Sequence, residues 1–193
     1  MSERAEWDVT LPASGAERDA AMIRAAADTL GEARLADWAV RLLTGAARVG
    51  DPADPDPVLI GAVPGWMPYW SRVWGARVLL HVWPSRAGVA ESAVLAGLSD
   101  EEWRVRVLCA QITAVHGVRG AEDTLVQLTG DPVPHVRSAA ARALGEVGSD
   151  RAAPTLDQLM MDPDSVLADA AETALARLAE RLDRPDLRPD SEY

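Results

Sequence analysis

The sequence contains no lysine, asparagine or phenylalanine, and only one of its 193 residues is a cysteine. The single cysteine excludes an internal disulfide and a zinc site built from several cysteines. The other absences are typical of a very GC-rich genome, so the use of arginine instead of lysine does not indicate phosphate binding. No apolar run approaches the roughly 18 residues needed to span a bilayer, and the start of the chain lacks the pattern of a signal peptide. We therefore expect a soluble cytoplasmic protein.

The charge of the chain is strongly acidic, with a formal net charge of −11 at pH 7. An acidic protein is repelled on average by nucleic acids and by anionic membranes, so neither is an expected partner. Because charge can be distributed unevenly, the average does not exclude a local basic surface. The hydrophobic content of 48% and the length suit one globular domain with a real core.

Three segments, which begin at Ser99, Gly130 and Met161, align without a gap at a spacing of 31 residues. Each has an aspartate near its start, followed by apolar or small residues at matching positions. The matching sets are Asp100, Asp131 and Asp162; Val105, Val136 and Leu167; Cys109, Ala140 and Ala171; and Ile112, Ala143 and Ala174. Such a shared register indicates an internal repeat.

Each repeat is predicted to be a pair of helices. Apolar or small residues recur at helical spacing between Val136 and Val147, and a shorter apolar helix precedes each aspartate. A hairpin of about 30 residues cannot bury both of its faces alone, so the units must stack. The expected starts of the longer helices are Asp131-Pro132, Asp162-Pro163 and a capping box from Ser99 to Glu102.

The segment DPVPHVRSAAARALG, which starts at Asp131, resembles a HEAT repeat of the bacterial, phycobilin-lyase-like type. The resemblance covers roughly residues 65–182. It implies an all-α fold: a short right-handed superhelix of the HEAT or armadillo type, with about four helical hairpins plus N-terminal helices. HEAT repeats occur in proteins of many functions, so the resemblance specifies a fold more than an activity.

The resemblance also implies an electrostatic ladder, in which the aspartate of each repeat and the arginine that follows it interact through the turn region. Here the residues would be Asp100 with Arg106 and Asp131 with Arg137. The third repeat has Ala168 in place of the arginine, which fits a terminal unit that has no neighbour to bind.

A further unit precedes these three, because YWSRVWGARVLLHV from Tyr69 aligns with the next unit at a shift of 34 residues. Upstream, residues 17–30 and 35–46 are predicted to form helices, and the proline-rich GDPADPDP ends the second. We expect N-terminal capping helices and an Asp/Pro-rich loop in residues 1–57, HEAT-like repeats in 58–183 and a flexible tail in 184–193.

A candidate binding surface follows from the register of the longer helices, which usually line the concave side of such a stack. Subtracting the core positions leaves a row predicted to be exposed: Trp70, Val73, Arg77, Arg104, Val107, Gln111, His135, Ser138, Arg142, Val166, Asp169 and Thr173. Tryptophan, tyrosine and arginine dominate binding energy in protein interfaces. The predicted partner-binding residues are Tyr69, Trp70, Arg77, Trp103, Arg104, His135 and Arg142.

Other conspicuous residues have structural interpretations. Trp38, Trp74 and Trp83 are expected to fill the core or to pack between repeats, and Cys109 is expected to be a buried thiol. The three histidines form no H-x-x-x-H or H-E pair, so we predict no metal site. No nucleophile elbow, phosphate-binding loop or dinucleotide fingerprint is present, so we predict neither a cofactor nor a catalytic residue.

Two functions fit these observations. The first is a non-catalytic interaction module that binds a protein or peptide through its concave face. The alternative is a small-molecule binder or enzyme with a tryptophan-lined pocket, as implied by the HEAT-like DNA glycosylases and the phycobilin lyases. The glycosylase interpretation is weakened by the net charge of −11 and by the absence of an obvious carboxylate beside the rings.

Overall fold

The computed structural model describes residues 13–63, 65 and 67–188, and Trp7, Trp66 and the end of the predicted tail lie outside them. Within this part the chain forms nine α-helices and no β-strand, which confirms the predicted all-α fold. The helices are α1 (Ala13–Leu30), α2 (Glu32–Leu43), α3 (Tyr69–His81), α4 (Gly88–Gly97), α5 (Trp103–His116), α6 (Glu122–Leu128), α7 (Pro134–Val147), α8 (Ala153–Leu159) and α9 (Ser165–Leu182).

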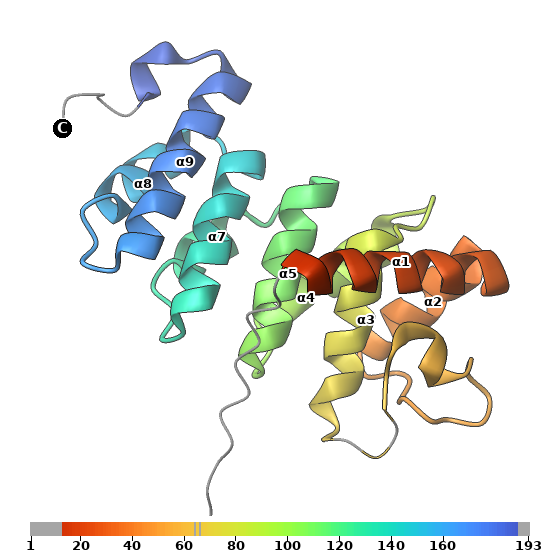
Figure 1. The fold of residues 1–193 in the computed structure, drawn as a ribbon. Coiled ribbons are helices and arrows are strands. Elements are labelled where there is room, and N and C mark those ends of the chain that lie inside the picture. Colours follow the sequence, from red (N-terminus) through yellow and green to blue (C-terminus); the bar gives the residue numbers. More distant parts are fainter. Residues whose placement is uncertain (1–12, 64, 66, 189–193) are drawn as a thin grey trace, which may run out of the picture.

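Four helical hairpins form the body of the structure. α2 packs on α3, and α4, α6 and α8 pack on α5, α7 and α9. The second helices of the hairpins, α3, α5, α7 and α9, pack side by side in chain order (Figure 1). The prediction of an α-helical solenoid of about four hairpins is therefore confirmed, and α2 provides the first helix of the first hairpin.

The first helix, α1, does not continue this stack but lies across α3 (Figure 1). It also packs against α2 and against the 3-10 helix η1 (Pro57–Ile60). Its residues Ile23, Ala26 and Ala27 are buried, which is the pattern of an amphipathic helix with one face on the protein. The outward sides of α3, α5, α7 and α9 form one surface, which α1 covers in part at α3. We call this surface the second-helix face.

Two glycines allow neighbouring helices to approach closely. A Cβ atom added to Gly75 of α3 would lie 2.6 Å from the carbonyl oxygen of Ala39 and from the backbone nitrogen of Leu43, both in α2. A Cβ atom added to Gly145 of α7 would lie 2.8 Å from the Cα atom of Ala174 in α9. Because these atoms belong to the backbone, they cannot yield without moving a whole helix.

Two of the longer helices begin later than the sequence predicts. α7 begins at Pro134, three residues after Asp131. The Asp131 carboxylate instead accepts a hydrogen bond of 2.8 Å from the backbone N–H of Val133, which closes a turn ahead of the helix. Asp162 forms the same turn before α9, and the cap of that helix is Asp164.

The predicted capping box from Ser99 to Glu102 is also wrong. The Ser99 N–H still donates to the carbonyl of Ala96, so the chain at this point completes the turn that ends α4. α5 begins at Trp103, and Glu102 itself caps it by accepting from the backbone N–H of Arg104.

Ion pairs link each unit to the next at one end of the stack, near the starts of the second helices. The shortest N–O distances are 2.8 Å for Arg72 to Asp100, 2.9 Å for Arg106 to Asp131 and 3.2 Å for Arg137 to Asp164. We call this series the arginine–aspartate ladder. Its arginines come from α3, α5 and α7, and its carboxylates lie at the start of the following second helix. The hydrogen bond to Asp100 raises the pKa of Arg72.

The ladder corrects the pairing that the HEAT resemblance implies. Within one unit, Arg106 donates to the backbone carbonyls of Asp100 and Glu101, and Arg137 donates to that of Asp131, so neither reaches the carboxylate of its own unit. The carboxylates pair with the arginine of the preceding unit. An arginine in place of Ala168 would have no following aspartate in the repeat pattern to pair with.

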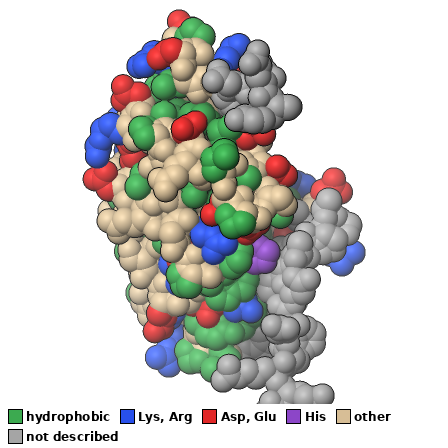
Figure 2. All heavy atoms as spheres, turned by 90° about the vertical axis from the view of Figure 1, so that its left-hand side faces the viewer, with side chains coloured by type: hydrophobic (Ala, Val, Ile, Leu, Met, Phe, Trp, Pro, Cys, Tyr) green, Lys and Arg blue, Asp and Glu red, His purple; other side chains and the backbone are tan. Residues whose placement is uncertain are grey.

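The last unit ends the stack with a polar flank. Ser138 and Ala141 of α7 are buried, whereas Asp169 and Glu172 occupy the same repeat positions in α9 and are exposed. Seen from this end, charged side chains of both signs lie along the upper edge of the surface, among hydrophobic and other atoms (Figure 2). A polar outer face is typical of the capping repeat of a solenoid.

We expect Gly75→Ala to destabilise the protein by about 1–3 kcal/mol, because the added methyl group would force α2 and α3 apart. The free energy of unfolding is measured by urea denaturation. The matched control is Gly88→Ala in the first turn of α4, where a Cβ atom meets nothing within 4 Å. Equal stability of the two variants would show that the close approach at Gly75 is not required.

The Arg106–Asp131 pair should show a coupling energy of at least about 1 kcal/mol in a double-mutant cycle with Arg106→Met and Asp131→Asn. Both side chains are nearly buried, and asparagine still accepts from Val133. The control is the cycle for Arg151 and Asp123, a pair at 3.2 Å whose side chains are 74% and 79% exposed. Its coupling should stay below about 0.5 kcal/mol; similar values for both pairs would contradict a structural role for the ladder.

Candidate functional site

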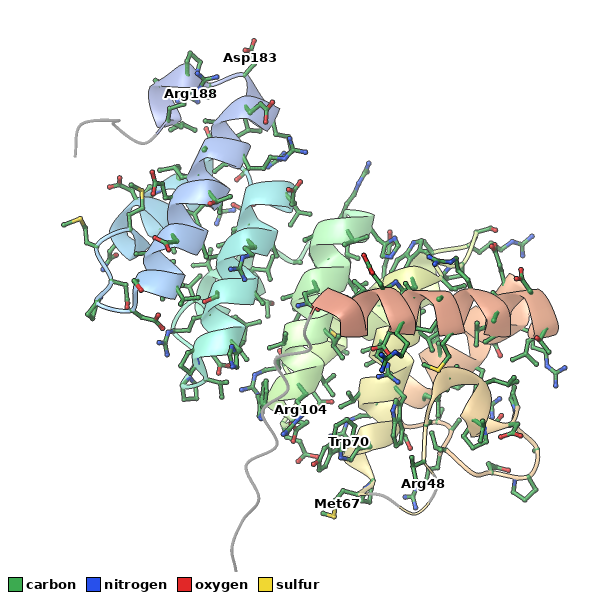
Figure 3. All side chains as sticks on the ribbon, in the orientation of Figure 1. Arg48, Met67, Trp70, Arg104, Asp183 and Arg188 are labelled. Carbon is green, nitrogen blue, oxygen red and sulfur yellow. The ribbon has the colours of Figure 1, made fainter. Side chains whose placement is uncertain are left out.

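Aromatic and charged side chains from three units meet at the starts of the second helices. The group consists of Tyr69, Trp70, Trp103, Arg104 and His135, and we call it the aromatic–arginine cluster. Trp70 and Arg104 point toward one another from α3 and α5 (Figure 3). His135 lies in the first turn of α7. Five of the seven predicted partner-binding residues are thus brought together.

The contacts within the cluster form an unbroken series. The ring centroids of Tyr69 and Trp70 lie 5.7 Å apart, and the guanidinium carbon of Arg104 lies 5.7 Å from the Trp70 ring. The same carbon lies 4.5 Å from the Trp103 ring, whose centroid is 5.9 Å from that of His135. Arg104 therefore bridges two tryptophans through cation–π contacts, which hold the rings of neighbouring units together.

The arginine–aspartate ladder explains why these residues lie in a line. Arg72 comes three residues after Tyr69, and Arg106 comes three residues after Trp103, so each ladder residue lies about one helical turn from a cluster residue. By pairing each unit with the next, the ladder aligns the starts of the second helices. Residues from the first turns of different helices then come within contact distance.

The charge of Arg104 is partly balanced by Glu102. Their side chains lie 2.7 Å apart, and both are more than four-fifths buried, at 19% and 16% exposure. Sequence analysis found no carboxylate beside the rings, so Glu102 corrects that expectation. The sequence feature that could have revealed Glu102 is its position directly before α5, where a residue that caps the helix is expected. Glu102 is held by Arg104 and by its capping contact, so it fixes the guanidinium between the rings.

Arg77 lies elsewhere, and the prediction that it is exposed is wrong. Its guanidinium is 3.2 Å from Asp19 of α1 and donates a hydrogen bond of 2.9 Å to the carbonyl of Ile60. Burial beneath α1 lowers the pKa of Arg77, and the Asp19 carboxylate opposes this shift. The repeat register could not reveal this burial, because α1 is not part of the repeat.

The rest of the predicted row is partly exposed. Val73 and Ser138 are buried, which corrects their expected exposure, since neighbouring helices cover those positions. Arg142 is exposed on α7, seven residues after His135, and pairs with no carboxylate among residues 13–63, 65 and 67–188. The exposed members at the far end are Val166, Asp169 and Thr173.

The remaining tryptophans of the described chain have packing roles, as predicted. Trp38 and Trp74 are 1% and 4% exposed and belong to the core. Trp83 stacks on His116, with ring centroids 4.4 Å apart and planes 9° from parallel. Sequence analysis missed this stack, although the two residues lie 33 positions apart, close to the 34-residue shift between these units.

The pKa values of Cys109 and His81 are shifted by their surroundings. Cys109 is fully buried, and this burial raises the pKa of its thiol far above the usual range. Partial desolvation lowers the pKa of His81, although the residue as a whole is exposed. Within the ranges that the structure describes, histidine, cysteine, aspartate and glutamate side chains form no group of three or more suited to a metal ion. No helix in those ranges is both long and apolar enough to cross a bilayer.

Comparison with known proteins supports the repeat assignment. The sequence profile of the HEAT repeats matches residues 91–176. The matched segment runs from within α4 to within α9 and therefore includes the last three hairpins. No curated protein matches the chain significantly.

The burial of Cys109 predicts that the native protein resists thiol-specific disulfide reagents, because the thiolate is both inaccessible and unfavoured. We expect no reaction beyond the rate of unfolding, and one thiol per chain after addition of denaturant. Absorbance of the released chromophore measures both rates. Rapid stoichiometric reaction of the native chain would contradict the inert role of Cys109.

Proposed function

The chain is a HEAT-repeat protein, and we propose that it binds a protein or peptide partner through the second-helix face, with the aromatic–arginine cluster as the main contact. HEAT repeats commonly mediate protein interactions, and solenoids present extended surfaces to their partners. Beyond this general role of HEAT repeats, the proposal assigns the partner to one surface of this chain, the second-helix face around the aromatic–arginine cluster.

The continuity of the cluster across three units carries the proposal. A site that extends from Tyr69 on α3 to His135 on α7 suits an extended ligand more than a compact one, because it follows the length of the stack. The apolar rings and the guanidinium of Arg104 offer the residue types that concentrate binding energy in interfaces. Since cation–π contacts and the Glu102 pair already fix Arg104, the surface loses little side-chain entropy on binding.

The alternative is a small flat ligand held against the rings, as in an enzyme pocket. Glu102 is the one observation in its favour, since it brings a carboxylate close to Trp70 and Trp103 through Arg104. This carboxylate is already paired, which reduces its capacity to act as a base or to hold a cationic base of DNA. The net charge of −11 opposes binding to duplex DNA as well. We therefore prefer the peptide-binding function.

A pull-down from lysate tests the proposed function. The immobilised chain should capture a partner in stoichiometric amount, and Trp103→Ala or Arg104→Ala should weaken binding at least about tenfold. The control is Val89→Ala, which removes a side chain that is 71% exposed on the first-helix side of the stack. Circular dichroism melting ensures that the variants are folded. Equal capture by the Trp103→Ala and Val89→Ala variants would rule out the cluster as the contact.

A further inference from the structure

One helix already covers part of the second-helix face, because α1 packs on α3 as well as on α2 and η1. An ion pair to α3 and a buried face of α1 accompany this contact. Asp19 pairs with Arg77 at 3.2 Å, with side chains that are 16% and 20% exposed, and Ile23, four residues later, is fully buried. Ala26 is also buried and lets the helix approach closely. The docking pattern is therefore an acidic residue (Asp19), an aliphatic residue one turn later (Ile23) and a small residue after it (Ala26).

Arg77 has an equivalent in a later unit. The repeat shifts of 34, 31 and 31 residues place Arg77, Gln111, Arg142 and Thr173 at one position of the second helices. Of these four residues, Arg142 is the second arginine. No helix of the described structure covers it, so it is exposed and pairs with no described carboxylate. The two arginines also have matching neighbours, because Trp70 precedes Arg77 by seven residues and His135 precedes Arg142 by seven.

We propose that the partner of the second-helix face is an acidic amphipathic helix that pairs a carboxylate with Arg142, as α1 pairs Asp19 with Arg77. This inference rests on the proposed function and names the class of partner. Such a helix would lie two turns along α7 from His135, next to the aromatic–arginine cluster. Its aliphatic residue would contact α5, where Val107 and Ala114 are half-buried and packed against the core.

Arg142 favours a carboxylate as the group that contacts it directly, although Asp169 on the neighbouring α9 adds an exposed negative charge to the same face. Among the described residues near the cluster, Arg104 is held by Glu102, whereas Arg142 is exposed and pairs with no described carboxylate. The net charge of −11 repels an acidic helix at long range. At physiological ionic strength, however, such repulsion is screened beyond about 8 Å, so the short contact with Arg142 decides the preference.

The α1 sequence itself provides the probe. A fluorescein-labelled synthetic peptide with the sequence of residues 17–30 is titrated with the full-length protein, and binding is followed by fluorescence anisotropy. A second peptide carries Asp19→Arg. We expect the native protein to bind the first peptide about tenfold more tightly than the second, and Arg142→Glu to reverse that preference. Arg86→Glu, at another exposed arginine, is the matched control and should leave the preference unchanged.

Several outcomes would overturn the proposal. Equal behaviour of Arg142→Glu and Arg86→Glu would show that the peptide either displaces α1 from Arg77 or binds elsewhere. If the peptide binds only to a chain that lacks residues 2–11, the occupant of this surface is the chain's own N-terminal segment and not a separate helix.

The two proposals fail in different ways. If the pull-down partner depends on Trp103 but is captured equally by Arg142→Glu, the proposed function stands and the acidic-helix partner is rejected. If Trp103→Ala has no effect on lysate capture, the proposed function itself fails, whatever the peptide does.

Discussion

The arginine–aspartate ladder is the interaction on which the geometry of this protein depends. In a solenoid each hairpin contacts only its neighbours, so the offset between two units is set entirely by the contacts across one interface. The ladder supplies such contacts at one end of the stack, because Arg106 binds the Asp131 carboxylate through two nitrogens, at 2.9 and 3.1 Å. Both side chains are shielded from water, so screening by salt is weak. The offset of the units is thereby fixed where the candidate site lies.

Small residues set the second dimension of the stack, which is the distance between helices. Gly75 and Gly145 face backbone atoms of a neighbouring helix, and the buried alanines of α7 extend this close packing. Fixed offset and short spacing together explain the aromatic–arginine cluster. Trp70, Arg104 and His135 are separated from one another by more than 30 residues in the sequence. Arg104 nevertheless contacts the Trp70 ring, and it reaches His135 through Trp103, because α3, α5 and α7 begin side by side at the same end of the stack.

The repeat register made much of this predictable. It located three complete hairpins, the second helix of the first hairpin, the stacking of the second helices and the gathering of aromatic residues where the first two units meet, because each depends on spacing within the repeat. It could not predict what lies outside the repeat. α1 is an alanine-rich helix whose docking depends on a single ion pair and a few apolar contacts, so the burial of Arg77 was missed. The helix starts were misplaced for a local reason: an aspartate before proline can close a turn as readily as it can cap a helix.

The two ends of the stack restrict where a partner can bind. At the N-terminal end, α1 occupies the upper part of α3 and leaves the turn with Trp70 to the cluster. At the C-terminal end, Asp169 and Glu172 replace the buried Ser138 and Ala141, so no further helix can pack there without burying unpaired carboxylates. The surface open to a ligand therefore runs from the first turn of α3 over α5 and α7 to α9. It is aromatic at its start and acidic at its end, so its two ends differ in chemistry.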